Sequence, residues 1–101
     1  MHYLLDEFLV AERFLQRALT INRAQRNLKE IATNLNNLCL YQGDTEKKLS
    51  FIQEAIAINK NLDAQWSLGE NYNNMGKQYY FGEQYSKALE ALQKAYEYAH
   101  N

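Results

Sequence analysis

Two pairs of adjacent asparagines are the polar feature of this sequence whose type and spacing could support recognition. Asn36-Asn37 and Asn73-Asn74 lie 37 residues apart, each inside a segment whose apolar residues recur at helical spacing. Asparagine is a mediocre helix former because its side chain competes for backbone hydrogen bonds. Each side-chain amide offers both a donor and an acceptor. The pairs could therefore hold the backbone of a ligand or bridge adjacent helices internally, and a compositional bias toward asparagine would also produce them.

The other reactive residue types do not form a site. His2 and His100 lie near the chain ends, and Cys39 has no histidine near it in the sequence. The glutamates are scattered rather than arranged as ligand pairs, which is typical of a solvated helix face. Neither a glycine-rich phosphate loop nor a dinucleotide-binding glycine pattern occurs. We therefore expect a protein that is not an enzyme and that has no cofactor and no metal site.

The charge balance argues against a nucleic-acid partner. The 101 residues include 11 Lys and Arg and 12 Asp and Glu, for a net charge of −1. A nucleic-acid binder usually has a basic excess or a basic stripe. The mild basic run between Arg13 and Lys29 is partly offset by Glu12 and Glu30, and no aromatic stacking pattern accompanies it. A solvated outer face is the simpler interpretation of this run.

Composition predicts a helical protein of the cytoplasm. Proline is absent and only four glycines occur, whereas β-sandwiches and barrels need frequent turn residues. The longest apolar run near the start, Phe8 to Ala11, is far shorter than the roughly 20 residues of a membrane span. The N-terminus also lacks the succession of basic, apolar and small residues that marks a signal peptide. One cysteine cannot form an internal disulfide, which fits a reducing compartment. We expect no membrane association.

Five helices must position the asparagines. Apolar periodicity predicts them over residues 3–24, 27–41, 46–60, 63–81 and 84–99. Asp44 or Thr45 is expected to cap the third helix, because a short polar side chain accepts an orphan amide hydrogen there. Gly82 is expected to end the fourth. The connections are short, so neighbouring helices should pack antiparallel.

Three segments repeat one pattern along the chain. They are residues 11–18, 48–55 and 88–95. In each segment a bulky apolar residue stands four positions after the first residue, and an alanine stands seven positions after it. The final alanines, Ala18, Ala55 and Ala95, are 37 and 40 residues apart. The unit is therefore a helix pair of about 40 residues, as in repeat arrays. Residues 1–101 form a single domain of such units, which can be a piece of a longer array.

This unit resembles the tetratricopeptide repeat family. The resemblance is carried by Tyr72-x-x-Met75-Gly76-x-x-Tyr79, followed by Tyr85-x-x-Ala88-x-x-x-Leu92-x-x-Ala95. The preceding unit, with Leu35, Leu38, Cys39 and Ala55, is similar to repeats of kinesin light chains and of bacterial signalling proteins. The first segment looks like the second helix of a unit whose first helix is missing. About two and a half repeats thus cover nearly the whole chain.

The resemblance implies an all-α, right-handed solenoid of antiparallel helix pairs. Small residues should allow close helix crossings, with Gly76 facing Ala88, while bulky neighbours fill the space between helices. The expected packing residues are Leu35, Leu38, Cys39, Ala55, Tyr72, Met75, Gly76, Tyr79, Ala88, Leu92 and Ala95. Two departures stand out. The turn after Tyr41 arrives about three residues early, and Lys48 replaces the usual small alanine.

The resemblance also implies a function in protein–protein interaction. In the family, the first helix of each pair lines a concave groove, here residues 27–41 and 63–81, which would bind a peptide or a partner helix. Asn37 and Asn74 are the leading candidates for peptide contact, followed by Asn36 and Asn73; further candidates are Lys77 and Tyr80. Two alternatives remain open. The chain could be a structural spacer that self-associates through uncapped ends, or the peptide-sensing part of a bacterial signalling regulator.

Overall fold

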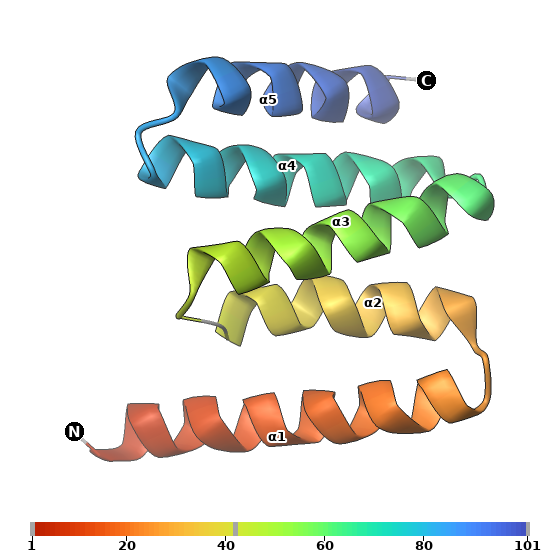
Figure 1. Ribbon diagram of the computed structural model, residues 1–101, viewed down its shortest axis with the longest axis vertical. Helices are drawn as coiled ribbons and strands as arrows, with labels where there is room; N and C mark the ends of the chain where they lie inside the picture. The colour runs from red at the N-terminus through yellow and green to blue at the C-terminus, as the bar shows by residue number, and fades with distance from the viewer. Residues whose placement is uncertain (1, 42, 101) are drawn as a thin grey trace.

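Five α-helices, joined by short turns, make up the computed structural model, which describes residues 2–41 and 43–100 and the side chains from Glu7 onward (Figure 1). The helices are α1 (His2–Ala24), α2 (Leu28–Leu38), α3 (Thr45–Asn61), α4 (Gln65–Phe81) and α5 (Tyr85–Ala99). No strand occurs within the described ranges. The prediction of an all-helical chain with five helices is therefore confirmed, and the helix ends agree with expectation to within about three residues.

The second helix differs most from its expected range. Its α-helical part ends at Leu38, and a 3-10 turn over Cys39–Tyr41 completes it. With 11 residues it is shorter than α3 and α4, which have 17 each. The early turn noted in the sequence therefore costs this helix its last α-helical turn.

The helices pack in the order in which they occur in the chain. Figure 1 shows them stacked from α1 to α5, with successive helices running in opposite directions. The main helix–helix contacts join α1 to α2, α2 to α3, α3 to α4, and α4 to α5. The molecule measures 37 × 35 × 20 Å. Sequential packing of this kind places α2 and α4 on either side of α3, while the specific repeat-solenoid geometry stays a prediction.

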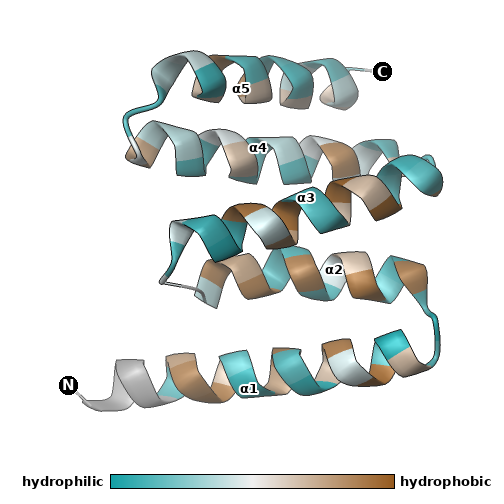
Figure 2. Ribbon diagram, in the orientation of Figure 1, coloured by the Kyte–Doolittle hydropathy of each residue, from teal (hydrophilic) through white to brown (hydrophobic). Residues whose placement is uncertain are grey.

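The core consists of two apolar clusters centred on α2, α3 and α4. The first contains Leu19, Ile31, Ala32, Leu35, Leu38 and Ala55; the second contains Cys39, Ile52, Ile56, Leu68 and Tyr72. The ring of Phe51 packs against both clusters and connects them. Figure 2 shows hydrophobic segments alternating with hydrophilic ones along the helices, with prominent hydrophobic segments in α2 and α3. Burial of these side chains supplies the main favourable term in folding.

Side-chain caps define where two helices begin. Asp44 caps α3, because its carboxylate accepts hydrogen bonds from the backbone amides of Glu46 at 2.9 Å and Lys47 at 3.4 Å. Of the two residues expected at this position, Asp44 is therefore the cap. Asn27 caps α2 by accepting a hydrogen bond from the amide of Glu30. Such caps satisfy amide donors that have no partner inside the helix.

Three of the turns share a left-handed residue. Arg26, Asp63 and Glu83 have φ angles of 56°, 53° and 62°, and each stands two residues before the next helix. In each turn, the amide that follows the left-handed residue bonds back to a carbonyl five residues earlier. This is the pattern of a Schellman helix end, where glycine is the usual left-handed residue. Gly82 is not in this conformation: its φ is −85°, and Glu83 takes the left-handed position.

A surface ion pair links α1 to α3. The guanidinium of Arg23 donates two hydrogen bonds to the carboxylate of Glu54, at 2.8 and 3.1 Å. This hydrogen bonding raises the pKa of Arg23, and burial opposes the effect. Both side chains remain substantially exposed, so solvent screens the pair and it contributes little to stability. In the described part of the chain, no helix is both long and apolar enough to cross a bilayer.

Candidate functional site

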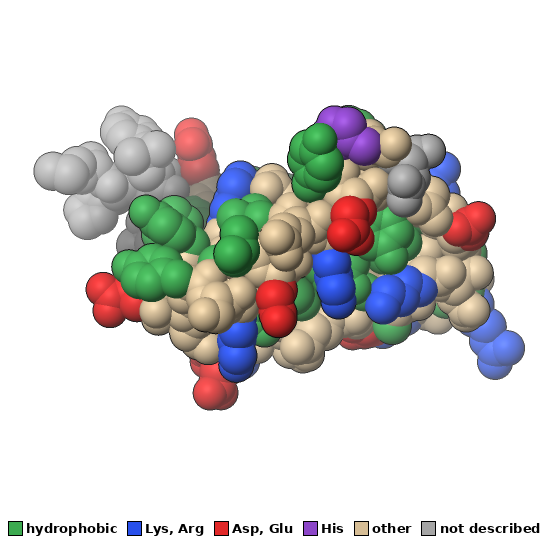
Figure 3. All heavy atoms as spheres, turned by 90° about the horizontal axis from the view of Figure 1, so that it is seen from above, with side chains coloured by type: hydrophobic (Ala, Val, Ile, Leu, Met, Phe, Trp, Pro, Cys, Tyr) green, Lys and Arg blue, Asp and Glu red, His purple; other side chains and the backbone are tan. Residues whose placement is uncertain are grey.

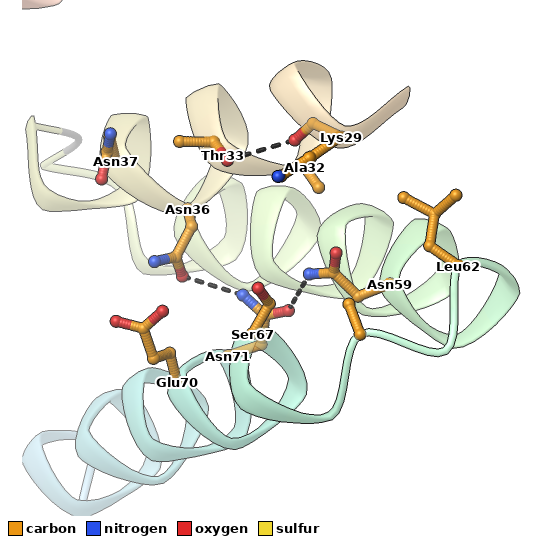
Figure 4. A pocket seen from close by; sticks show the side chains of 11 residues that line it. Lys29, Ala32, Thr33, Asn36, Asn37, Asn59, Leu62, Ser67, Glu70 and Asn71 are labelled. Carbon is orange, nitrogen blue, oxygen red and sulfur yellow. Dashed lines mark hydrogen bonds between the residues drawn. The ribbon is translucent and has the colours of Figure 1, made fainter. Parts of the chain in front are cut away.

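A hollow of about 620 Å³ lies between α2 and α4, with the C-terminal end of α3 beneath it (Figure 4). We call it the α2–α4 groove. Its lining consists of Lys29, Ala32, Thr33, Asn36, Asn37, Asn59, Leu62, Ala64, Ser67, Glu70 and Asn71. Most of these side chains are polar, and eight of the eleven residues come from α2 and α4, the two helices that the sequence predicted to line a groove; the others are Asn59 of α3 and Leu62 and Ala64 of the turn that follows it.

Helical spacing brings the α2 residues of the groove to one side. Lys29, Thr33 and Asn36 follow one another at intervals of four and three, which places them on a common face. The hydroxyl of Thr33 donates a hydrogen bond to the backbone carbonyl of Lys29 at 3.1 Å. The opposite wall comes from Ser67 and Glu70 on α4. The groove therefore has a basic group on one wall and an acidic group on the other.

A chain of asparagine amides crosses the floor of the groove. The Nδ2 of Asn59 donates to the Oδ1 of Asn71 at 2.7 Å, and the Nδ2 of Asn71 donates to the Oδ1 of Asn36 at 3.0 Å. The Nδ2 of Asn74 donates to the same Oδ1 at 2.9 Å. Asn59 and Asn71 are buried, and their mutual bond meets the requirement that buried polar groups be paired. One asparagine from each of α2 and α3 is thus fixed against α4.

The same amide contact occurs one unit earlier. The Nδ2 of Asn22 on α1 donates to the Oδ1 of Asn34 on α2 at 2.6 Å. Asn22 and Asn34 each stand 37 residues before Asn59 and Asn71, and both pairs are 12 residues apart. The internal bridge between helices, one of the two uses considered for asparagine, is therefore present in the structure.

Asn37 differs from the other groove asparagines. It is half-buried and lines the groove, yet its side-chain amide forms no hydrogen bond with another residue in the described ranges. The Nδ2 of Asn36 likewise has no acceptor there, although its Oδ1 accepts two bonds. The groove therefore presents one complete amide and one further donor to an incoming ligand.

The six residues predicted to contact a peptide do not lie together. Asn36 and Asn37 line the α2–α4 groove, whereas Asn73 lines a different hollow between α4 and α5. Asn74 is committed to its bond with Asn36. The remaining two do not line the groove: Lys77 is exposed on α4, and the exposed ring of Tyr80 contacts the rings of Phe81 and Tyr85. The two asparagine pairs are therefore not equivalent in space.

Sequence reasoning missed several groove residues. Two charged lining residues, Lys29 and Glu70, lie on helix faces that the sequence alone does not distinguish from solvated ones. Asn59 and Asn71 carried a usable signal, because each repeats an asparagine 37 residues earlier. That spacing reveals a structural contact rather than a ligand contact.

The residues expected to pack between repeats are mostly inside. Leu35, Leu38, Cys39, Ala55, Tyr72, Gly76 and Ala88 are buried, and Met75, Tyr79 and Ala95 are half-buried. A β-carbon built on Gly76 would lie 2.7 Å from Leu92 and 3.3 Å from the carbonyl oxygen of Ala88. The close crossing expected at Gly76 and Ala88 is therefore present. Leu92 contacts this crossing but is 39% exposed on its other side.

Cys39 is placed for packing. Its side chain is buried in the second core cluster, and its Sγ donates to the backbone carbonyl of Asn36 at 2.9 Å. Burial raises the pKa of the Cys39 thiol, and the charge of Lys48 offsets part of that rise. Since the thiolate is the reactive form, this environment suppresses reactivity.

Among the described side chains, those of residues 7–41 and 43–100, no group of three or more His, Cys, Asp and Glu is placed to hold a metal ion. Comparison with protein-family models, curated proteins and solved structures found no match to this chain.

Proposed function

We propose that this chain is a tetratricopeptide-like interaction module that binds an extended segment of a protein partner in the α2–α4 groove. The observation that carries the proposal is the amide of Asn37, which is half-buried, lines the 620 Å³ hollow and has no hydrogen-bond partner among the described residues. The Nδ2 of Asn36, which lines the same hollow, likewise has no acceptor among them. An amide held in this way can donate to one peptide carbonyl and accept from one peptide N–H.

Preorganisation supports this role for the groove. Asn71 and Asn74 hold the Oδ1 of Asn36, so its Nδ2 is already oriented when a ligand arrives. A group that is fixed before binding loses less conformational entropy on binding. The amide chain between helices and the ligand contact are therefore complementary uses of the same asparagines.

The polarity of the groove favours an extended peptide over a partner helix. A helix satisfies its own backbone groups and would cover Lys29, Thr33 and Glu70 mainly with side chains, at a desolvation cost. An extended segment instead offers its backbone donors and acceptors to these polar groups. Binding of extended backbone is a recurring mode of peptide recognition.

The test is a selection from a displayed library of random dodecapeptides against the wild-type chain. The affinities of selected synthetic peptides are then measured by calorimetry for wild type, Asn37→Ala and Asn73→Ala. We expect Asn37→Ala to weaken binding by about 1 to 3 kcal/mol, the usual cost of leaving a buried polar partner unpaired. Asn73→Ala is the matched control, because it removes the same side chain from the neighbouring hollow.

Two results would refute the proposal that the α2–α4 groove binds a peptide. One is a selection that yields no peptide with saturable binding. The other is a peptide whose affinity is the same for wild type and Asn37→Ala, or whose affinity falls only in Asn73→Ala.

A further inference from the structure

The packing of α4 onto α2 and α3 shows how this chain builds a docking surface for a helix. Leu68 and Tyr72 of α4 lie in the same core cluster as Ile52 and Ile56 of α3. Under this cover, Ile52 is 0% exposed and Ile56 is 7% exposed. The amides of Asn71 and Asn74 add two polar contacts to Asn36 on α2.

The same surface recurs one unit later without a covering helix among the described residues. The counterparts of Ile52 and Ile56, 40 residues on, are Leu92 and Tyr96, which are 39% and 65% exposed. They line a hollow of about 380 Å³ together with residues of α4. Two of these α4 residues are Asn73, which is the counterpart of Asn36, and Trp66, which is 75% exposed. We call this surface the α4–α5 face. Figure 3 looks onto α5 and shows exposed hydrophobic side chains among charged ones on that side.

The other end of the stack presents an uncovered helix. Val10, Phe14 and Ile21 are all exposed on α1, with Phe14 64% exposed. Their intervals of four and seven place them along one side of α1, and we call this side the α1 stripe. The same intervals separate Leu68, Tyr72 and Tyr79 on α4, the helix that covers the earlier surface.

The polar positions of the α1 stripe also correspond to those of α4. With Val10 aligned to Leu68, Arg13 falls at the position of Asn71 and Gln16 at the position of Asn74. Both are hydrogen-bond donors, as the contact to Asn36 requires, and Asn73 would be their acceptor. The alignment therefore matches the α1 stripe to α4 at the polar positions as well as at the apolar ones.

The surroundings of the α4–α5 face can accept Arg13 where the earlier surface accepts Asn71, both in volume and in charge. The asparagine that bonds Asn71 is Asn59, and its counterpart on α5 is Ala99, which is smaller and leaves room for the longer Arg13. Glu70 lines the α4–α5 face and supplies an acidic partner for Arg13 or Arg17. Arg13 and Arg17 beside the α1 stripe, where Glu12 also lies, and Glu70 on the α4–α5 face thus place opposite charges at the two ends of one chain.

We propose that the α4–α5 face binds the α1 stripe of a second copy of this chain, so that copies associate head to tail. The two surfaces of such a contact differ, so the association is heterologous and continues beyond a dimer unless the ends close on one another. Phe14 would occupy the place that Tyr72 occupies on Ile52 and Ile56, against Leu92 and Tyr96. This proposal concerns the ends of the stack; the α4–α5 face shares Glu70 with the peptide groove, whereas neither Phe14 nor Tyr96 lines that groove.

The test measures molar mass by light scattering over a concentration series for wild type, Phe14→Glu, Tyr96→Glu and an equimolar mixture of the two variants. The molar mass of wild type should increase with concentration. It should either exceed that of a dimer or level off at that of a small closed ring. Each variant alone should remain a monomer, because association would bury the new charge on one of its two surfaces. The mixture should form a dimer and stop there, since each variant still has the surface that the other has lost.

Phe81→Glu is the matched control, because Phe81 is 75% exposed and lines neither surface. It should associate as wild type does, and circular dichroism should show unchanged helicity in all variants. Three outcomes would overturn the proposal: wild type that is monomeric throughout, a variant that still dimerises by itself, or a mixture that stays monomeric. A variant that still dimerises would indicate a contact between two identical faces instead.

Discussion

At the scale of single residues, two glycines of α4 should respond oppositely to the same substitution. Gly76→Ala places a β-carbon 2.7 Å from the Cγ and Cδ2 of Leu92 and 3.3 Å from a backbone oxygen. Overpacking of this kind typically costs about 1 to 3 kcal/mol, which exceeds the gain of about 1 kcal/mol in helix propensity. We expect Gly76→Ala to lower the free energy of unfolding by about 1 kcal/mol, as measured by urea denaturation.

Gly69→Ala is the internal comparison for that prediction. Its β-carbon would meet its nearest atoms at 3.6 Å, which is ordinary contact. The gain in helix propensity should then remain, and stability should rise by about 0.5 to 1 kcal/mol. Equal effects at the two positions would show that the crossing at Gly76 is looser than described.

The buried amide pair makes a second prediction at this scale. Asn59→Ala leaves the Oδ1 of Asn71 without its donor at a site that is 1% exposed. A buried acceptor without a partner costs about 1 to 3 kcal/mol. Asn22→Ala removes the equivalent donor from Asn34, where Asn22 is only half-buried and water can replace it. We therefore expect the loss of unfolding free energy to be larger for Asn59→Ala; equal losses would contradict this account.

At the scale of elements, the left-handed residue in three of the turns is not a glycine. Glu83 has a φ of 62°, and a β-carbon in this region costs roughly 1 to 2 kcal/mol. Glu83→Gly removes that cost but increases the entropy of the unfolded chain. We expect a net gain in stability of about 0.5 kcal/mol. The measurement is the midpoint of thermal unfolding.

Gly82→Ala provides the control for this turn. Gly82 has a φ of −85°, which alanine adopts without strain. The substitution should therefore not lower stability, as it would if Gly82 were the left-handed residue. A marked loss of stability for Gly82→Ala, together with no gain for Glu83→Gly, would show that Gly82, and not Glu83, is the left-handed residue.

Most of the element boundaries could be predicted from the sequence, because apolar periodicity and caps are local signals. Asp44 illustrates this, since a short acidic side chain before an apolar run specifies a helix start. Glu83 illustrates the limit. Gly82 ends α4 as the sequence predicted, but the left-handed conformation falls one residue later, at Glu83, a position that no local signal in the sequence indicated.

The candidate site could be predicted less completely, for a geometric reason. Adjacent helical residues point about 100° apart, so Asn73 and Asn74 face different neighbours across α4. Asn74 turns toward α2 and bonds Asn36, whereas Asn73 turns toward the hollow beside α5. The 37-residue spacing specified which positions correspond, but the crossing of the helices decided which amides are used internally and which remain free.

At the scale of the whole molecule, apolar exposure is unevenly distributed. Among the described residues, the exposed large apolar side chains are concentrated in α1, α4 and α5, and none belongs to α3. The deepest buried side chains lie in α2, α3 and α4, with Leu35, Leu38 and Ile52 at 0% exposure. Local opening follows the density of buried contacts. The stack should therefore be most stable in its middle.

Hydrogen exchange followed by mass spectrometry tests this distribution. Amides in the middle of α2, α3 and α4 should exchange slowest, and those of α1 and α5 should exchange faster by at least tenfold in dilute protein. Raising the protein concentration should slow exchange in α1 and α5 selectively if copies associate head to tail. Uniform protection along the chain at low concentration would contradict the assigned core.

The two asparagine bonds also define a portable segment of the chain. Asn22 and Asn59 follow the equivalent residues Ile21 and Ile58, so a second copy of residues 22–58 inserted after Ile58 would begin and end at native-like junctions. Each added segment would bring its own amide donor for the helix that follows and its own amide acceptor for the helix that precedes. A longer protein could thus be made by tandem duplication of one stretch of coding sequence, with the alignment of every new helix pair specified by the duplicated amides.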